Sequence, residues 1–359
     1  MNELEAMRRA LALARQGWGR VHPNPMVGAV VLSGDELVGE GFHAEYGREH
    51  AERVALIAAG GRARGGTLVV TLEPCAHFGK QPPCVDAIIY AGVRRVVVAA
   101  ADPHPVAGGG AARLRDAGIE VELGLLRQEA EQQNAGFFHA VRSPARPWVA
   151  LKLATSLDHR IADGSGGSKW ISGSVARSFT HALRAGFDAI GVGGRTAIRD
   201  NPLLTPRGHI TPRVPPTRVI FAGNASLPGS LAVFALEGQT VVITSKAAAA
   251  DARQRLRHAA ILPADTLPEA LAALRGSGVG SLLVEGGGRL AGGLLREGLI
   301  DRYYWIQSPV WLGDTGVPAT VGWNVAALPD AERWCVVERR PLGEDTLMVL
   351  DREPCSPVS

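Results

Sequence analysis

Apolar positions in the first part of the chain follow helical and strand spacing in turn. An apolar stripe at three- and four-residue intervals runs over residues 4–14, behind a capping Asn2 with Glu5 three positions on, and predicts a helix that ends near Gly17. Beyond it we expect strands over residues 27–32, 37–42, 67–72 and 95–100, and helices over 50–59, 85–91 and 109–117.

Residues 143–147, Ser-Pro-Ala-Arg-Pro, interrupt this alternation and are the best candidate for a linker. After them we expect strands over 148–154, 189–192, 217–222, 240–244, 281–284 and 302–307 and near 347–350, with helices over 174–185 and 290–296. Strands that alternate with helices are typical of α/β layers around parallel or mixed sheets. We therefore predict two α/β domains, residues 1–145 and 146–354.

Composition narrows the class of protein. A chain of 359 residues with 46% hydrophobic content accommodates two packed domains. The net charge of +3, without a basic run, argues against a nucleic-acid partner. No apolar run approaches the roughly 18 residues of a membrane helix, and the first residues lack the order of a secretion signal. With two of the four cysteines close together, we expect a cytoplasmic enzyme.

The chemistry is concentrated in His50-Ala51-Glu52, Pro74-Cys75 and Cys84. One imidazole and two thiolates form a three-ligand zinc set, which leaves the fourth tetrahedral position for water. The Glu52 carboxylate is the right kind of group to move protons on and off that water. Nucleobase deaminases that use zinc carry this arrangement. The pattern predicts hydrolytic conversion of an amine to a carbonyl on an aromatic ring, with Glu52 as the catalytic residue.

The spacing of these residues restricts where they lie. Residues i and i+2 point to nearly opposite sides of a regular helix, so His50 and Glu52 share a site only if His50 stands at a helix start. Cys84 follows Pro82-Pro83 and is expected to begin a helix. A structural zinc site is the alternative, but it normally needs four protein ligands. His77 is the remaining candidate, and we interpret it as a loop residue.

The two cysteines are nine residues apart, with a proline-rich loop between them. With this loop, the chain resembles the family of bifunctional riboflavin-biosynthesis deaminase/reductases, over about residues 2–350. The motifs of this half are His22-Pro23-Asn24-Pro25-Met26-Val27-Gly28, His50-Ala51-Glu52, Thr71-Leu72-Glu73-Pro74-Cys75 and Gly79-Lys80-Gln81-Pro82-Pro83-Cys84. The resemblance implies a cytidine-deaminase-like αβα domain acting on a phosphoribosylated pyrimidine. It also implies that Asn24 contacts the substrate and that Lys80 meets its phosphate.

A glycine run, Glu285-Gly286-Gly287-Gly288, follows the expected strand 281–284 and precedes a helix. Glycines let backbone N–H groups approach a phosphate, and a helix N-terminus favours anions. The run lacks the G-x-G-x-x-G order of a dinucleotide fingerprint. On these residues alone, nucleotide binding and simple packing both stay open.

The resemblance extends through this half along Lys152-Leu153-Ala154-Thr155-Ser156-Leu157-Asp158, Gly167-Ser168-Lys169-Trp170-Ile171, His181-Ala182-Leu183-Arg184 and a run from Thr196 to Arg207. It implies a dihydrofolate-reductase-like α/β domain that uses NADPH to reduce the ribosyl group to a ribityl chain. By motif match, the cofactor would contact Ala154, Trp170, Thr196, Asp200, Gly287, Gly288, Arg289, Leu290, Ala291, Gly292 and Gly293. The substrate would contact Ser168, Arg184, Leu204, Arg207 and Glu285. Lys152, Asp200 and Glu285 are the candidates for proton supply, with Lys152 the one we carry forward.

Three positions depart from the family pattern. His104 stands where the family has Asn, and Gln81 where it usually has Thr. His159 stands where the family usually has Gly, so a positive φ there would strain the backbone. These departures leave the two chemistries in place.

Together these features predict a two-step enzyme, zinc-dependent deamination followed by NADPH-dependent reduction, on a small phosphoribosylated pyrimidine. A nucleoside or tRNA deaminase fused to an unrelated domain is the first alternative. A zinc-stabilised binding module is the second. We expect one Zn²⁺ per deaminase domain, no nucleic acid or membrane partner, and a homodimer or homotetramer.

Overall fold

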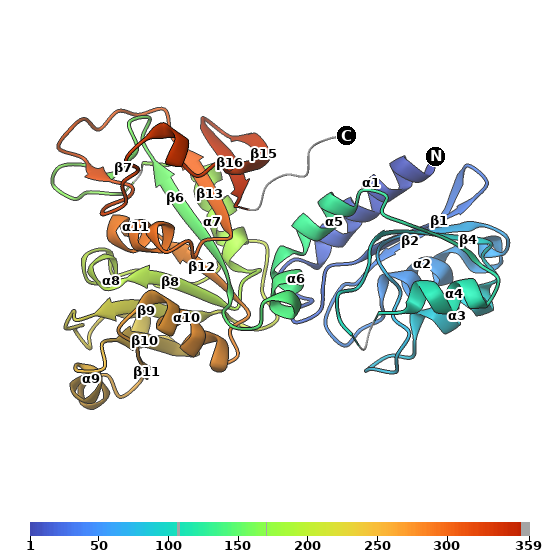
Figure 1. The fold of residues 1–359 in the computed structure, drawn as a ribbon, viewed down its shortest axis with the longest axis horizontal. Helices are drawn as coiled ribbons and strands as arrows, with labels where there is room; N and C mark the ends of the chain where they lie inside the picture. Colours follow the sequence, from blue (N-terminus) through green and yellow to red (C-terminus); the bar gives the residue numbers. More distant parts are fainter. Residues whose placement is uncertain (106–107, 170, 353–359) are drawn as a thin grey trace. The chain divides into compact units, whose positions relative to one another are not determined.

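The computed structural model describes residues 1–105, 108–169 and 171–352 (Figure 1). Trp170, a predicted cofactor contact, and the predicted end of the second domain at residue 354 lie outside these residues. The chain divides into two compact units. One unit comprises Met1–Ser143 with Pro212–Val214, and the other comprises Pro144–Thr211 with Pro215–Ser359.

The first unit is built on a five-stranded mixed sheet in the order β2-β1-β3-β4-β5. Its strands are β1 (Gly28–Ser33), β2 (Glu36–Phe42), β3 (Thr67–Leu72), β4 (Arg95–Ala100) and β5 (Glu120–Leu123). Its helices are α1 (Glu3–Ala14), α2 (Ala51–Ala59), α3 (Cys84–Ala91), α4 (Gly110–Asp116), α5 (Arg127–Gln133) and α6 (Ala135–Arg142). β1 runs antiparallel to β2 and β3, whereas β3, β4 and β5 are parallel.

Apolar side chains alternate between the two faces of this sheet. Val31 and Val70 face a core formed with α2, α3 and α4, whereas Val30 and Val69 face a second core formed with α1, α5 and α6. This two-sided burial explains why β3 and β4 are continuous apolar runs. The layers confirm the predicted αβα fold class.

Helix starts in this unit follow local sequence rules. Asn2 and Glu5 form a complete capping box at α1, as expected. α2 begins directly after His50, and α3 begins at Cys84 behind Pro83. The sequence pattern did not predict β5, α5 or α6. β5 is mostly exposed at the sheet edge, so it lacks the apolar alternation that marks a strand.

The second unit contains a nine-stranded sheet in the order β11-β10-β9-β8-β12-β6-β13-β16-β15. The seven strands from β11 to β13 are parallel, and β16 and β15 are antiparallel additions. The strands are β6 (Trp148–Thr155), β8 (Ala189–Gly193), β9 (Thr217–Gly223), β10 (Thr240–Thr244), β11 (Ala260–Pro263), β12 (Ser281–Glu285), β13 (Arg302–Gln307), β15 (Cys335–Leu342) and β16 (Asp345–Asp351). A separate pair joins β7 (Arg160–Ala162) to β14 (Val317–Pro318).

Helices cover both faces of the large sheet. They are α7 (Ser174–Arg184), α8 (Gly194–Asp200), α9 (Ala249–Arg255), α10 (Leu267–Gly276) and α11 (Gly288–Arg296). α10 and α11 pack with alternate side chains of the parallel strands, such as Leu151 and Val241, while Ala197 of α8 packs with the opposite set, such as Ile190 and Ile220. Among the described residues, no helix is both long and apolar enough to cross a membrane.

Candidate active sites

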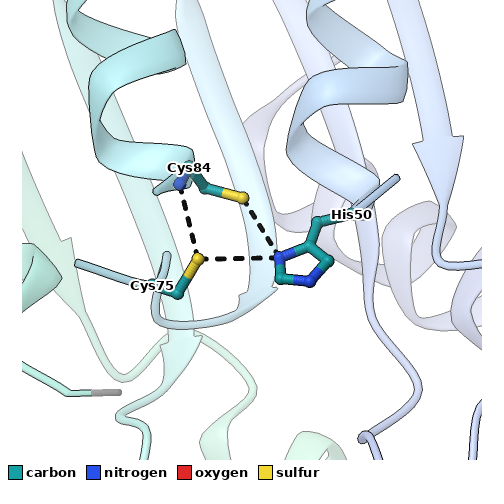
Figure 2. Close-up of side chains that lie close together, drawn as sticks. All are labelled: His50, Cys75 and Cys84. Carbon is teal, nitrogen blue, oxygen red and sulfur yellow. Dashed lines mark hydrogen bonds between the residues drawn. The ribbon is translucent and has the colours of Figure 1, made fainter. Parts of the chain in front are cut away.

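His50, Cys75 and Cys84 converge from three elements in the first unit (Figure 2). The Nδ1 atom of His50 lies 3.6 Å from Cys75 Sγ and 3.3 Å from Cys84 Sγ. A tetrahedral zinc with ordinary Zn–N and Zn–S bonds places such atoms about 3.5 Å apart. The three ligand atoms lie within 4.8 Å of one another, so the donor set and its spacing fit a zinc ion.

Local structure explains this convergence. Cys75 follows the carboxyl end of β3, Cys84 is the first residue of α3, and His50 is the N-cap of α2 in an extended conformation. His50 therefore stands outside the regular helix, as its spacing from Glu52 required. Within the described residues, this is the one group of three or more His, Cys, Asp and Glu side chains placed to hold a metal.

The two thiols differ in their ionisation. The Cys84 thiol and then the His50 imidazole lower the pKa of Cys75 to about 4, against the opposing effect of burial. The interaction with Cys75, followed by burial, raises the pKa of Cys84. A thiolate at Cys75 is the form that binds metal. A bound cation would hold the second thiol in the same form.

Glu52 lies in the first turn of α2, and only 3% of it is exposed. Burial raises the pKa of Glu52, and the neighbouring His50 opposes that rise. The carboxyl group therefore exchanges a proton more readily near neutral pH than an exposed glutamate does. It lines the same cavity as His50 and Cys75, and Cys84 lies directly behind them in the ligand set.

A cavity of about 310 Å³ opens beside this cluster. Predicted contacts Asn24 and Lys80 both line it, together with Asp102 and His104. The Nζ of Lys80 lies 4.1 Å from the centre of the Tyr46 ring, which holds the ammonium at the cavity by a cation–π contact. The structure thus brings the predicted deaminase residues into one pocket.

His43 also lines the cavity and was missed in the sequence. It is 2% exposed, and its ring meets His50 edge-on with centroids 5.3 Å apart. Its Nδ1 faces the Glu49 carbonyl at 3.0 Å, and its Nε2 faces the Asn24 Nδ2 at 3.2 Å. Burial lowers the pKa of His43, so a neutral ring accepts from Asn24 and donates to Glu49. A buried histidine just past the end of β2 is the signal that could have identified it.

Glu73 fixes the far wall of this cavity. Its carboxylate accepts hydrogen bonds from the backbone N–H groups of Asp102 at 3.1 Å, Gly109 at 3.2 Å and Ala111 at 2.9 Å. These bonds join the end of β3 to the loop after β4 and to the start of α4. His104 keeps a place in the wall because its N–H donates to the Asp102 carboxylate at 2.8 Å. The departure at position 104 therefore leaves the loop closed.

The second unit contains a larger cavity of about 1460 Å³ at the carboxyl ends of its parallel strands. Ligands of open α/β sheets occupy this position. Gly287 has φ +87°, and a Cβ on Gly288 would lie 2.4 Å from the Pro318 carbonyl oxygen. A Cβ on Gly287 would lie 3.0 Å from Thr196 Oγ1, so the β12–α11 and β8–α8 turns approach closely. Only glycine permits this cradle.

The predicted cofactor residues divide between this cavity and its surroundings. Thr196, Gly287, Gly288, Arg289, Leu290 and Gly293 line the cavity. Ala291 is fully buried, and a Cβ on Gly292 would lie 2.1 Å from the Val321 carbonyl oxygen, so both face the packed interior. Ala154 and Asp200 are not among the lining residues. The sequence also missed the segments 221–225 and 264–268, which line the cavity from β9 and from the turn after β11.

Arg184 and Glu285 form a two-point ion pair in this unit. Nε and Nη2 of Arg184 donate to the Glu285 carboxylate at 2.5 and 2.8 Å, and Nη1 donates to the Thr205 carbonyl at 2.9 Å. Burial opposes ionisation, yet the Arg184 guanidinium holds the pKa of Glu285 below its usual range. Lys152 of β6 is paired in register with Glu285 of β12, and burial lowers the pKa of Lys152.

The other predicted substrate residues have different settings. Leu204 is 2% exposed with φ +52° and packs into the core, so it shapes the loop. Arg207 is exposed, and Ser168 is partly exposed. Arg184 has all three guanidinium nitrogens engaged, whereas within the described chain no hydrogen bond or ion pair occupies Arg207.

A zinc donor set in an αβα sandwich, joined to a glycine-edged cavity on a mostly parallel sheet, defines a zinc-dependent deaminase fused to a dinucleotide reductase. Residues 1–100 match the cytidine and deoxycytidylate deaminase zinc-binding region, and residues 147–347 match the RibD C-terminal domain. The chain belongs to the RibD family. It is a bifunctional deaminase/reductase of riboflavin biosynthesis with a zinc-binding deaminase domain and a reductase domain that uses NADPH.

Relatives support this assignment over nearly the whole chain. The chain is 41% identical over 312 residues to the riboflavin biosynthesis protein RibD of Aquifex aeolicus, covering 86% of this chain and 87% of that one. Its structure is similar to that of Acinetobacter baumannii RibD, form 1, with a TM-score of 0.85 and 35% identity, covering 98% and 99% of the two chains. A Thermotoga maritima diaminohydroxyphosphoribosylaminopyrimidine deaminase/5-amino-6-(5-phosphoribosylamino)uracil reductase gives a TM-score of 0.84 at 35% identity, with the same coverage.

Proposed function

We propose that residues 1–145 deaminate 2,5-diamino-6-(5-phosphoribosylamino)pyrimidin-4(3H)-one to 5-amino-6-(5-phosphoribosylamino)uracil. Residues 146–354 then reduce the ribosyl group of that product to a ribityl chain with NADPH. The observation that carries the proposal is the three-ligand set His50, Cys75 and Cys84 beside the buried carboxyl group of Glu52. A structural zinc site would have no use for an ionisable group next to an open coordination position.

In the deaminase, zinc bound by His50, Cys75 and Cys84 supplies Lewis acidity that makes a water molecule more acidic. Glu52 is the catalytic residue, and it accepts a proton from the attacking water. It then delivers protons to the ring nitrogen and to the leaving amine. The raised pKa of Glu52 supports this role, because a group that both takes and gives a proton works best with a pKa near the working pH.

Asn24 and His43 hold the pyrimidine in this proposal. The neutral His43 accepts from the Asn24 amide nitrogen, which leaves the amide oxygen of Asn24 to accept from the substrate. Lys80, held at the cavity by the Tyr46 ring, meets the phosphate. The 310 Å³ cavity is of a size for one pyrimidine with part of its side chain.

In the reductase, bound NADPH would supply the hydride for the imine-like C1′ of the ring-opened substrate, and Lys152 would give a proton to the adjacent nitrogen. Asp200 is less suited, because its carboxylate is engaged by Arg199, whose Nε donates to it at 2.9 Å. Glu285 is held ionised by Arg184, so it has no proton to give. Lys152, whose pKa is lowered by burial, releases its proton more easily than an exposed lysine.

Arg207 is our candidate for the phosphate of this second substrate, and the partly exposed Ser168 is a further candidate for contact with that substrate. An exposed guanidinium without a partner in the described chain can offer its rigid donor fork to a phosphate. Arg184 instead orients Glu285, whose carboxylate contacts the substrate in this proposal. Leu204 shapes the loop from which Arg207 extends.

The experiment supplies purified enzyme with the diaminopyrimidinone, with and without NADPH, and follows ammonia release and NADPH oxidation separately. We expect ammonia in both reactions and NADPH oxidation only after ammonia has appeared. Ammonia release that requires NADPH, or oxidation without deamination, would overturn the two-step order. A cytoplasmic location and a homodimer or homotetramer are further proposals from the sequence, and light scattering of the purified protein tests the second.

A further inference from the structure

Four arginines line the large cavity of the second unit, and two of them are already paired. Nε of Arg199 donates to Asp200 at 2.9 Å, and Nη1 of Arg296 donates to the Gly322 carbonyl at 2.9 Å. Arg195 and Arg289 are exposed, and within the described residues neither forms a hydrogen bond or an ion pair. Two guanidinium groups without a carboxylate partner among the described residues thus line this cavity.

The two free arginines lie at the starts of different helices. Arg289 is the second residue of α11, which follows β12, and Arg195 is the second residue of α8, which follows β8, one strand closer to β9. The cavity continues past Arg195 along the ends of β9 and β10 and past the end of β11. Arg289 therefore belongs to the helix start whose backbone N–H groups would suit a pyrophosphate, and Arg195 lies between that helix start and the outer end of the cavity.

The outer end carries an acidic group. Asp265 lines the cavity there, and its carboxylate accepts a hydrogen bond from the Lys246 backbone N–H at 3.0 Å. The Lys246 ammonium lies 3.5 Å from Asp265 and 3.0 Å from Glu269, so one cation is shared by two carboxylates and the group keeps a net negative charge. A carboxylate accepts from ribose hydroxyls but repels a phosphate. A phosphate on an adenosine ribose bound here would therefore be favoured on the Arg195 side of this end.

We propose that Arg195 binds the 2′-phosphate of NADPH and so makes the reductase discriminate NADPH from NADH. Arg289 binds the pyrophosphate, which both dinucleotides share. A guanidinium presents two parallel donors that match two oxygens of one phosphate, so losing it removes charge-assisted hydrogen bonds as well as charge. The inference rests on the reductase function and adds the residue that selects its cofactor.

Binding without catalysis tests the inference. The full-length protein is titrated calorimetrically with adenosine 2′,5′-bisphosphate and with 5′-AMP, which lacks the 2′-phosphate. We expect the wild type to bind the bisphosphate more tightly, and Arg195→Gln to weaken that binding roughly 10- to 100-fold, with 5′-AMP changed less than about 3-fold. Arg195→Lys retains the charge but loses the two parallel donors of the guanidinium. It should therefore bind the bisphosphate more weakly than the wild type and more tightly than Arg195→Gln.

Arg289→Gln is the matched control, since it removes an equally exposed arginine from the neighbouring turn. Its kcat/KM should fall by a similar factor for NADPH and for NADH, whereas Arg195→Gln should lower kcat/KM for NADPH alone. Equal losses for both nucleotides in Arg195→Gln, or a wild type that binds the bisphosphate no better than 5′-AMP, would overturn the inference. Because no pyrimidine is present in the titrations, failure of the proposed substrate chemistry would leave these binding results unchanged.

Discussion

The imidazole of His159 stands edge-on to the indole of Trp305, with ring centroids 5.0 Å apart and planes at 75°. His159 has φ +63°, so the position where the family usually has Gly does require left-handed backbone here. The Trp305 indole N–H donates to Thr155 Oγ1 at 2.9 Å, which fixes the ring that His159 contacts. An edge-to-face contact of about 0.5–1.5 kcal/mol offsets a backbone cost of similar size.

This balance predicts the order of stability of two variants. His159→Ala loses the ring contact and keeps the strain, whereas His159→Gly loses both. We expect the free energy of unfolding of the Ala variant to lie about 1 kcal/mol below that of the Gly variant. Urea unfolding followed by tryptophan fluorescence measures the difference. An Ala variant as stable as the Gly variant would show that the backbone here stores no strain.

Glu52→Gln should stop deamination while the reductase continues. The amide cannot accept the proton of the attacking water, so kcat for ammonia release should fall about 10²- to 10⁴-fold. NADPH oxidation on the deaminated substrate should stay at the wild-type rate, because Glu52 lies in the other unit. Zinc content serves as the folding control, since His50, Cys75 and Cys84 are untouched. Loss of both activities in a zinc-replete protein would contradict separate sites.

Removal of one zinc ligand should unload the metal. Cys84→Ser replaces a thiolate by a hydroxyl group, and its side chain is fully buried at the start of α3. We expect less than about one tenth of the wild-type zinc content by atomic absorption and no ammonia release, with reduction preserved. Ala87→Ser, which introduces a hydroxyl group farther along α3 and outside the cluster, is the matched control, and it should retain its zinc. Full zinc in Cys84→Ser would point to another ligand set.

Sequence reasoning succeeded where one physical rule decided the outcome. The stretches 67–72 and 95–100 are apolar enough to be strands in any packing, and Asn2 with Glu5 marks a helix start by local hydrogen bonds alone. The zinc ligands emerged because spacing and ligand chemistry together leave few alternatives. β11 and β15 were missed because most of their residues are exposed or partly exposed and carry no apolar alternation.

Contacts between distant segments could not be inferred in the same way. The motif marked Asn24, but no local pattern showed that the His43 ring contacts both Asn24 and the Glu49 carbonyl. The engagement of Arg184 by Glu285 depends on how α7 packs beside β12, over a separation of 101 residues. The motif alone placed Arg184 among the substrate contacts, and only the fold reveals that Glu285 and Thr205 already occupy its donors.

Glu285→Gln should shift the pH dependence of reduction. The Glu285 carboxylate raises the pKa of Lys152, against the lowering effect of burial, so removing its charge lowers that pKa further. If Lys152 donates the proton, kcat/KM falls as pH rises through its pKa, and this limb should move to lower pH in Glu285→Gln. Glu297→Gln, at an exposed residue of the same unit, should leave the profile in place. If the fall of kcat/KM moved to higher pH in Glu285→Gln, Lys152 would not be the proton donor.

Asp158 links a turn of the second unit to the loop after β13. Its carboxylate should make the free energy of unfolding depend on pH in the acid range. The Ser156 hydroxyl, and then the N–H groups of Leu312 and Gly313 that donate at 3.1 and 2.7 Å, lower the pKa of Asp158 to about 2. The folded pKa lies below the unfolded value of about 3.9, so this stabilisation is present above about pH 4 and is lost as pH falls toward 2.

Asp158→Asn should therefore be less stable than the wild type at about pH 6, and the gap should shrink at about pH 4 and again at about pH 3. Urea unfolding midpoints at these three values measure the gap. Asp163→Asn is a suitable comparison, because that carboxylate accepts only from its own loop, at Ser165 and Gly167. A gap that stays constant with pH would mean that the Asp158 carboxylate stabilises the loop by its shape as an acceptor and not by its charge.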